Sequence, residues 1–91
     1  MLLLPATLTM NEAHDALAML EQALRREPEA DIQIDASSLQ QFDTAAIALL
    51  LECQRLAHAW GKGLAVRHTP AKLAALAKLY GVDSLMRLEG A

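Results

Sequence analysis

The sequence predicts a small α/β domain that spans residues 1–91 and has a mixed β-sheet with helices packed against it. Three observations favour this class. Segments with the alternating pattern of a strand take turns with longer segments of helical periodicity, in the order strand, helix, strand, helix, strand, helix. Hydrophobic residues make up 54% of the chain and aromatic residues only 3%, so the core must be aliphatic. A chain of 91 residues can enclose one such core without disulfides or a metal.

The first elements of this pattern lie in the N-terminal third of the chain. Residues 2–4 and 6–8 are expected to form short strands. Thr9 then precedes a glutamate by three residues, which is the capping-box pattern of a helix start. The helix is expected to run to about Arg26, because Pro28 interrupts it soon afterwards. The residues that give it helical periodicity are Ala13, Ala16, Leu17, Leu20, Ala23 and Leu24.

The middle of the chain is expected to hold a strand, a loop and the second helix. Residues 31–36 alternate isoleucine with polar residues over the length of a strand, and residues 37–42 read as a loop. Asp43 is placed as the N-cap of a helix over residues 44–60. Gly61 follows the last periodic residue and ends this helix.

The C-terminal third contains the last strand and the last helix. Residues 64–68 have strand character. Thr69 is expected to cap the third helix, with Pro70 at its first position, where the missing amide is harmless. Gly81 is expected to close that helix as a left-handed C-cap, and residues 82–88 form a short tail.

The second helix is apolar on more sides than a single core contact requires. One stripe, about 120° wide on a helical wheel, is enough to cover the sheet. Its members are Ala46, Leu49, Leu50, Cys53, Leu56, Ala57 and Trp60. Ile47, Ala48 and Leu51 lie outside this stripe, on the side that also carries Thr44 and Arg55.

This second side predicts a surface that another protein binds. The small residues Ala45 and Ala48 allow a partner to approach the backbone, Ile47 and Leu51 would be apolar anchors, and Arg55 would belong to a polar rim. The alternative is that the two apolar anchors pack under neighbouring loops of the same chain.

The composition excludes several classes of function. Eleven acidic and eight basic residues give a formal net charge of −3, without any basic run, so no nucleic-acid partner is expected. Cys53 is the only cysteine, which excludes an internal disulfide and a multi-thiolate metal site. The apolar start of the chain is broken at Pro5 and has no basic segment before it, so neither a signal peptide nor direct membrane insertion is expected. The expected location is the cytoplasm.

No catalytic centre, cofactor or metal site is predicted. His14, His58 and His68 fall on three different elements, without cysteines or carboxylates at metal-ligand spacing beside them. The chain lacks a glycine-rich phosphate loop and a nucleophile elbow. Asp43 and Thr44 have the residue types of an acid and a nucleophile, but an aspartate at the head of a helix is first a cap. The chain is therefore not expected to be an enzyme.

Two motifs resemble those of a known family. Residues 43–50 read Asp-Thr-Ala-Ala-Ile-Ala-Leu-Leu, and residues 76–80 read Leu-Ala-Lys-Leu-Tyr. With the strands between and before them, they make the run from Ile32 to Leu85 similar to a STAS domain, the fold of anti-sigma-factor antagonists. The chain is most similar to the MlaB-like branch, in which the first motif reads Asp-Thr-Gly-Gly-Leu-Ala-Leu-Leu.

This resemblance implies a STAS-like single domain and a non-catalytic role. It suggests a cytoplasmic subunit that binds and supports or regulates the ATPase of an ABC-type phospholipid transport complex, in the pathway that maintains outer-membrane lipid asymmetry. The subunit would reach the inner membrane only through that complex. It would bind its partner through the start of the second helix, with the partner-binding residues Asp43, Thr44, Ala45, Ile47, Ala48, Leu51 and Arg55.

The resemblance leaves a second function open. An anti-sigma-factor antagonist, or a related partner-switching protein, binds a serine kinase or an anti-sigma factor. In that branch a Ser-Ser pair follows the aspartate, and the second serine is phosphorylated. Thr44 and Ala45 stand at these two positions, so the hydroxyl that accepts the phosphate is missing. Neighbouring genes for an ABC ATPase and a permease would favour the first function, and neighbouring genes for a kinase and a sigma factor the second.

Overall fold

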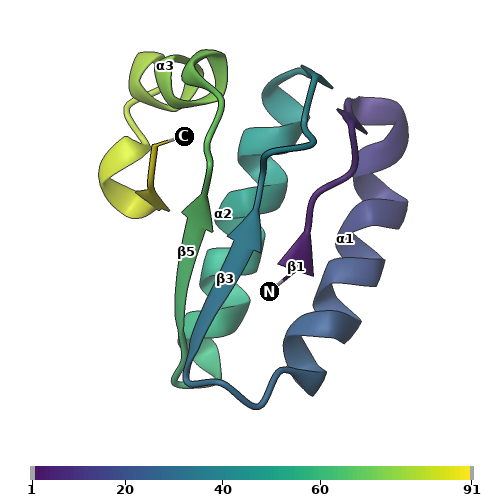
Figure 1. Ribbon diagram of the computed structural model, residues 1–91, viewed down its shortest axis with the longest axis vertical. Coiled ribbons are helices and arrows are strands. Elements are labelled where there is room, and N and C mark those ends of the chain that lie inside the picture. Colours follow the sequence, from purple (N-terminus) through teal and green to yellow (C-terminus); the bar gives the residue numbers. More distant parts are fainter. Residues whose placement is uncertain (1, 91) are drawn as a thin grey trace.

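A four-stranded sheet with the order β1-β3-β5-β6 is the centre of the computed structural model, which describes residues 2–90 (Figure 1). Its strands are β1 (Leu2–Leu3), β3 (Asp31–Asp35), β5 (Gly63–Arg67) and β6 (Arg87–Leu88). The α/β class predicted from the sequence is confirmed. A mixed sheet was expected, and within residues 2–90 the recorded strand pairs all run parallel. They do so because each link between neighbouring strands passes through a helical segment that returns the chain to the same end of the sheet.

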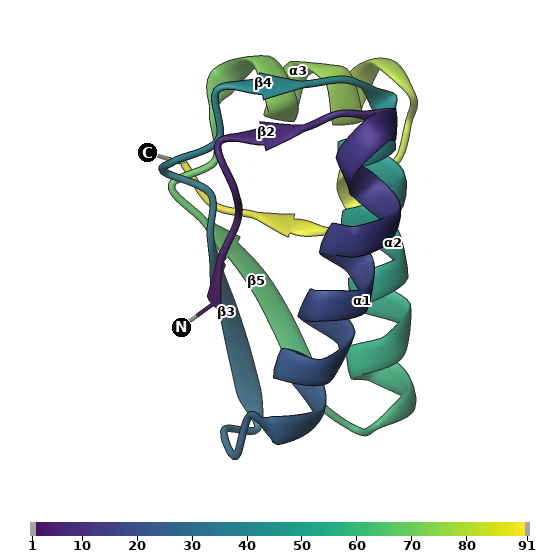
Figure 2. The same cartoon turned by 90° about the vertical axis from the view of Figure 1, so that its right-hand side faces the viewer.

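Two helices cover one face of the sheet. They are α1 (Met10–Arg26) and α2 (Thr44–Ala59), which run side by side on the same side of the strands (Figure 2). The shorter α3 (Ala71–Leu79) lies at one end of the sheet, and the 3-10 turn η1 (Asp83–Leu85) leads from it to β6. The predicted helix spans are therefore confirmed to within one or two residues.

The core lies between the sheet and these helices. Alternation in β3 turns Ile32 and Ile34 inward, and their register partners Leu64 and Val66 in β5 are buried with them. From the helices, buried side chains come at three- and four-residue spacing, which is the pattern of a helix with one covered face. They are Ala16, Leu20 and Leu24 of α1 and Ala46, Ile47, Leu49, Leu50, Cys53 and Ala57 of α2. Leu56 and Trp60 were expected in the same stripe and are half-buried, with Trp60 packed against this core.

The opposite face of the sheet carries polar side chains and faces the viewer in Figure 1. Asp31 of β3 and Arg87 of β6 form an ion pair with an N–O distance of 3.0 Å, although β5 lies between their strands. The pair crosses β5 at Gly63, where an added Cβ would lie only 2.6 Å from the Asp31 carboxylate. A parallel sheet is usually covered on both faces, and here charged side chains occupy the second face instead.

Three details of the chain differ from the sequence prediction, and the first is that the expected tail over residues 82–88 ends in a strand, β6, which pairs with β5. The expected loop over residues 37–42 contains a short strand, β4 (Gln41–Phe42), which pairs with β2 (Thr7–Leu8) in a separate two-stranded ladder. Such a short strand has no periodicity to detect. Thr69 is not the cap of α3, whose N-cap is Pro70. The Thr69 side chain is buried, and its hydroxyl donates a hydrogen bond to the Val66 carbonyl at 3.3 Å.

The ends of α2 and α3 follow the predicted glycine pattern. Gly61 and Gly81 have φ angles of +72° and +70°, in the left-handed region that favours glycine. At the end of α3, the Gly81 amide donates to the Lys78 carbonyl and the Val82 amide to the Ala77 carbonyl. This is the double hydrogen bond of a Schellman cap. The turn directs the chain back along α2, where the candidate site lies.

Candidate partner-binding surface

The site predicted from the sequence begins at the cap of α2. Asp43 is the N-cap residue, and its Oδ1 accepts a hydrogen bond from the Ala45 amide at 2.8 Å. The predicted cap is thus confirmed. Asp43 also does something that the sequence did not indicate, because its Oδ2 accepts a hydrogen bond from the Met10 amide at 3.1 Å. Met10 is the first residue of α1, so one carboxylate joins the starts of both helices.

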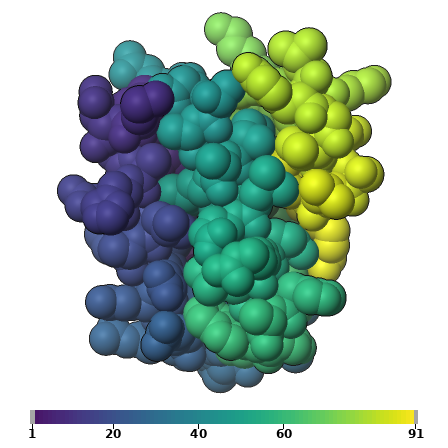
Figure 3. Space-filling view, turned by 180° about the vertical axis from the view of Figure 1, so that it is seen from behind, coloured from purple at the N-terminus to yellow at the C-terminus, as the bar shows by residue number. Residues whose placement is uncertain are grey.

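The other predicted site residues lie along the first three turns of α2. Thr44, Ala48 and Arg55 are exposed, and Ala45 and Leu51 are half-buried. Figure 3 shows the face on which α2 runs between α1 on one side and the C-terminal segment on the other. Thr44, Ala48 and Leu51 line one groove beside α2, and Ala45 and Ala48 line another, so the structure brings these four residues together.

Ile47 was placed wrongly by the sequence analysis. Its side chain is only 5% exposed and belongs to the hydrophobic core. The helical wheel took the sheet as the only neighbour of α2, but α3 also contacts α2, and the turn after α3 brings Tyr80 and Val82 to the groove that Ile47 lines. The alternative that Ile47 packs under a neighbouring segment of the chain is correct for this residue.

A groove of about 360 Å³ separates α2 from the end of α3. Its lining contains no charged side chain and consists of Thr44, Ile47, Ala48, Leu51, Tyr80 and Val82. Tyr80 is 59% exposed and the adjacent Leu79 is 78% exposed, so both add apolar surface beside this groove. Tyr80 and Val82 were not among the predicted site residues. The Leu-Ala-Lys-Leu-Tyr motif was the signal that could have indicated Tyr80.

A second groove of about 360 Å³ lies on the other side of α2, against α1. It is lined by Ala13, His14, Leu17, Ala45, Ala48, Leu49 and Glu52. Ala48 belongs to both grooves, so the α2 backbone there forms a low ridge between them. Small side chains at this ridge permit another chain to come close to the helix, as the sequence analysis expected of Ala45 and Ala48.

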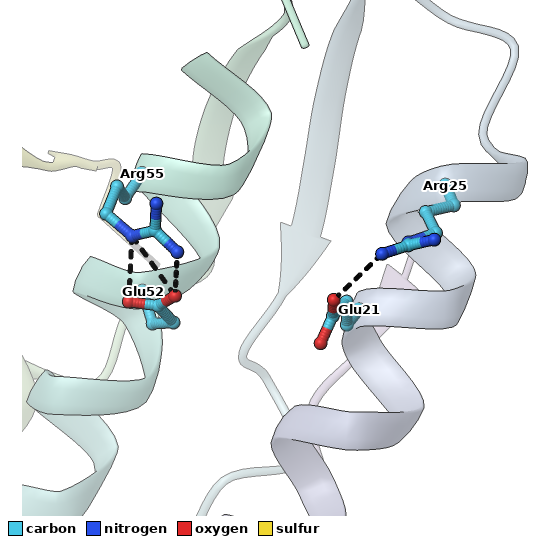
Figure 4. A network of polar contacts seen from close by, with 4 residues as sticks. All are labelled: Glu21, Arg25, Glu52 and Arg55. Carbon is cyan, nitrogen blue, oxygen red and sulfur yellow. Dashed lines mark hydrogen bonds and ion pairs between the residues drawn. The ribbon is translucent and has the colours of Figure 1, made fainter. Parts of the chain in front are cut away.

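Ion pairs lie on both helices that enclose the second groove, and Glu52 of one pair lines it. Figure 4 shows Arg55 bound to Glu52 on α2 and Arg25 bound to Glu21 on α1, the latter with an N–O distance of 3.2 Å. The hydrogen bonds from Arg55 hold the pKa of the Glu52 carboxyl below its usual value. Arg55 is thus neutralised by its own helix, which fits a place at the rim of an interface better than at its centre.

The histidines, the cysteine and the possible metal ligands of the described residues are the remaining groups with reactive side chains. Within residues 2–90, no group of three His, Cys, Asp or Glu side chains could hold a metal ion. His14, His58 and His68 are exposed on separate elements. Burial raises the pKa of the Cys53 thiol to about 12, so this cysteine has almost none of the thiolate that a nucleophile requires.

Over the same residues, none of the helices combines the length and the apolar character needed to cross a bilayer.

Comparison with known families agrees with this geometry. The family model described as "Mlab, STAS domain" matches residues 1–88, which is nearly the whole chain. The match includes both motifs at residues 43–50 and 76–80 and all the elements that form the two grooves. No curated protein matches the chain significantly in sequence.

Proposed function

We propose that this chain, which belongs to the MlaB-like branch of the STAS-domain family, is the non-catalytic subunit of an ABC-type phospholipid transport complex. STAS domains generally mediate protein–protein interactions. In the proposed role, the chain binds the ATPase of the complex from the cytoplasmic side and supports or regulates ATP hydrolysis by that partner. It would reach the inner membrane only through this contact.

The observation that carries the proposal is the uncharged groove between α2 and the end of α3. The exposed side chains of Thr44, Ala48 and Tyr80 and the half-buried Leu51 form a patch in which no charge has to be desolvated. A partner helix with a row of apolar side chains would fill the groove between α2 and α3. Because a specific complex buries about 800 Å² on each side, exposed Leu79 and the rim at Arg55 would have to contribute as well.

The partner-switching alternative has less support from the same surface. Phosphorylation in that branch takes place on the residue that Ala45 replaces, and alanine has no hydroxyl. Thr44 is exposed and has one, but its position is that of the first residue of the pair. An anti-sigma factor or a serine kinase is therefore the partner that the experiment would recover only if the alternative holds.

The proposal is tested by Leu51→Asp, which adds a carboxylate to the middle of the patch. Because Leu51 is half-buried, the charge stays hydrated in the free chain and becomes desolvated in the complex. We expect the affinity for the ATPase to fall by about thirtyfold or more, while circular dichroism and melting temperature show a folded chain. The affinity would be measured with the tagged full-length chain and the ABC ATPase that copurifies with it and is identified by mass spectrometry.

Leu3→Asp is the matched control. Leu3 is 66% exposed on β1, at the edge of the sheet and away from the patch, so this variant should bind like the wild type. Equal binding by Leu51→Asp and the wild type would place the interface elsewhere. Copurification with a serine kinase or an anti-sigma factor instead of an ABC ATPase would replace the proposed function with the alternative.

A further inference from the structure

The starts of α1 and α2 lie next to each other, although 33 residues separate them along the chain. Both helices begin beside the groove that they enclose, which is lined by Ala13 of α1 and Ala45 of α2. The position of one helix start against the other therefore decides how wide this groove is. Asp43 makes the one side-chain hydrogen bond recorded between the two starts within residues 2–90.

The hydrogen bonds at the start of α1 show why the Asp43 carboxylate is needed there. The first amides of a helix have no partner inside the helix. Thr9 and Glu12 satisfy two of them, because the Glu12 carboxylate accepts from the Thr9 amide at 2.9 Å and the Thr9 carbonyl accepts from the Glu12 amide at 3.0 Å. The Met10 amide donates to Asp43, at 3.1 Å.

Both oxygens of Asp43 are thus used inside the chain. Oδ1 holds the first turn of α2, and Oδ2 holds the first residue of α1. The Asp43 carboxylate is therefore less able to form hydrogen bonds with a partner protein than the neighbouring Thr44. The Thr44 side chain is exposed and makes no recorded hydrogen bond among residues 2–90. Asp43 is also only half-exposed, whereas Ala48 is exposed.

We propose that Asp43 is a positioning residue, which clamps the start of α1 to the start of α2 and so sets the width of the groove between them. This inference rests on the proposed function in one respect, since it assigns the clamped groove to the partner-binding surface. The role of Asp43 then differs from the one predicted from the sequence. Asp43 was predicted to contact the partner, and in this proposal it acts by holding the two helices in position.

The clamp explains why aspartate is required where other cap residues would serve α2 equally well. Serine and asparagine are as good as aspartate at an N-cap. Serine has one side-chain oxygen on a shorter side chain, and asparagine has one acceptor oxygen and an NH₂ group that can only donate. In the geometry of Asp43, each could keep the bond from the Ala45 amide, and neither has a second oxygen in the position from which Oδ2 accepts from Met10.

The test uses Asp43→Ser and Asp43→Asn in the full-length chain, followed by amide hydrogen exchange and ¹⁵N chemical shifts. We expect the Met10 amide to exchange about tenfold faster in both variants, because a charge-assisted hydrogen bond is lost. The Ala45 amide should keep its protection, and the amides of Ala13, Leu17 and Ala48 should change their shifts as the groove relaxes. Unchanged exchange at Met10 in both variants would overturn the clamp.

Asp35→Ser is the matched control. The Asp35 carboxylate accepts a hydrogen bond from the Ser37 amide at 2.8 Å, which is local to one turn and does not join two helices. This variant should leave Met10 and the groove amides as they are in the wild type. If it shifts them as strongly as Asp43→Ser does, the changes reflect general destabilisation and the positioning role is wrong.

Binding to the copurified ABC ATPase is the last readout, measured well below the melting temperature of each variant. We expect Asp43→Ser to bind about tenfold more weakly than the wild type and Asp35→Ser to bind equally well. Faster exchange at Met10 with unchanged affinity would show a clamp that does not serve binding, which contradicts the proposal. Failure of the wild type to bind any ATPase would refute the proposed function, and the exchange data would still decide the clamp.

Discussion

At the scale of single residues, Gly81 links the fold to the candidate site. Its left-handed conformation, with φ of +70°, ends α3 and places Tyr80 and Val82 at the edge of the groove beside α2. A Cβ added at Gly81 would meet no atom within 4 Å, so steric crowding by other segments is not the reason for glycine. The requirement comes from the backbone alone.

We predict that Gly81→Ala lowers the free energy of unfolding by about 1 kcal/mol, since an L-residue in the left-handed region is strained by that amount. Urea unfolding monitored by circular dichroism would measure the change. Gly90→Ala is the control, because Gly90 has open space around it and no positive φ angle, and it should be neutral within about 0.5 kcal/mol. Equal effects of the two substitutions would mean that the α3 cap is not formed as described.

At the scale of elements, α2 shows what the sequence could and could not predict. Its span and its Asp43 cap were predictable because both depend on local rules that concern a few neighbouring residues. The side on which Ile47 lies depends on where α3 and its following turn pack, which is a tertiary fact. Periodicity reports that a side chain is apolar, but it does not report which neighbour covers it.

The same distinction explains the other differences. Thr69 has the residue type of a cap, and it is instead drawn into the hydrogen bonding between β5 and the C-terminal segment, where its amide donates to the Glu89 carbonyl at 2.9 Å. The ladder of β2 and β4 joins segments that are 34 residues apart, so no local pattern announces it. The bond from Met10 to Asp43 is also long-range, and sequence reasoning missed it, as it missed Tyr80 and Val82 in the groove.

Ile47→Ala tests the corrected position of this side chain. We predict a loss of about 2–4 kcal/mol in the free energy of unfolding, as for other large-to-small substitutions in a core. Leu51→Ala should have a smaller effect, about 1 kcal/mol, because Leu51 is half-buried. Denaturant unfolding of both variants decides the order, and a larger effect at Leu51 would restore the original placement of Ile47 at the surface.

At the scale of the whole molecule, the two faces of the sheet are stabilised differently. The helices give one face an aliphatic core, and the other face is occupied by charged side chains such as Arg67, which pairs with Glu89 at 3.0 Å. Exposed ion pairs contribute only about 0–1 kcal/mol each, so most of the stability must come from the helical side. The surface of α2 that the core does not use is then available for a partner.

Charge also sets how the stability of the molecule depends on pH. Hydrogen bonds from Thr9 lower the pKa of Glu12, those from Ser37 lower the pKa of Asp35, and those from Arg55 lower the pKa of Glu52. The usual pKa values of Glu12, Asp35 and Glu52 are 4.5, 3.8 and 4.5. The unfolded chain therefore binds more protons than the folded chain in acid, and the free energy of unfolding rises with pH in that range.

We predict that stability from these three carboxylates is fully present above their usual pKa values and is lost as the pH falls through the lower values of the folded chain. Cys53 acts in the opposite direction: its pKa is raised from 9.0 to about 12, so its contribution is present below 9.0 and is lost as the pH rises toward 12. Urea unfolding at intervals from about pH 2 to about pH 10 would trace the acid and alkaline limbs of the plot of unfolding free energy against pH.

The combined variant Glu12→Gln, Asp35→Asn and Glu52→Gln should flatten the acid limb and leave the alkaline limb unchanged. It removes the groups whose protonation differs between the folded and unfolded states only in acid. An acid limb as steep as that of the wild type would show that other carboxylates, and not these three hydrogen-bonded ones, control the acid sensitivity of the fold.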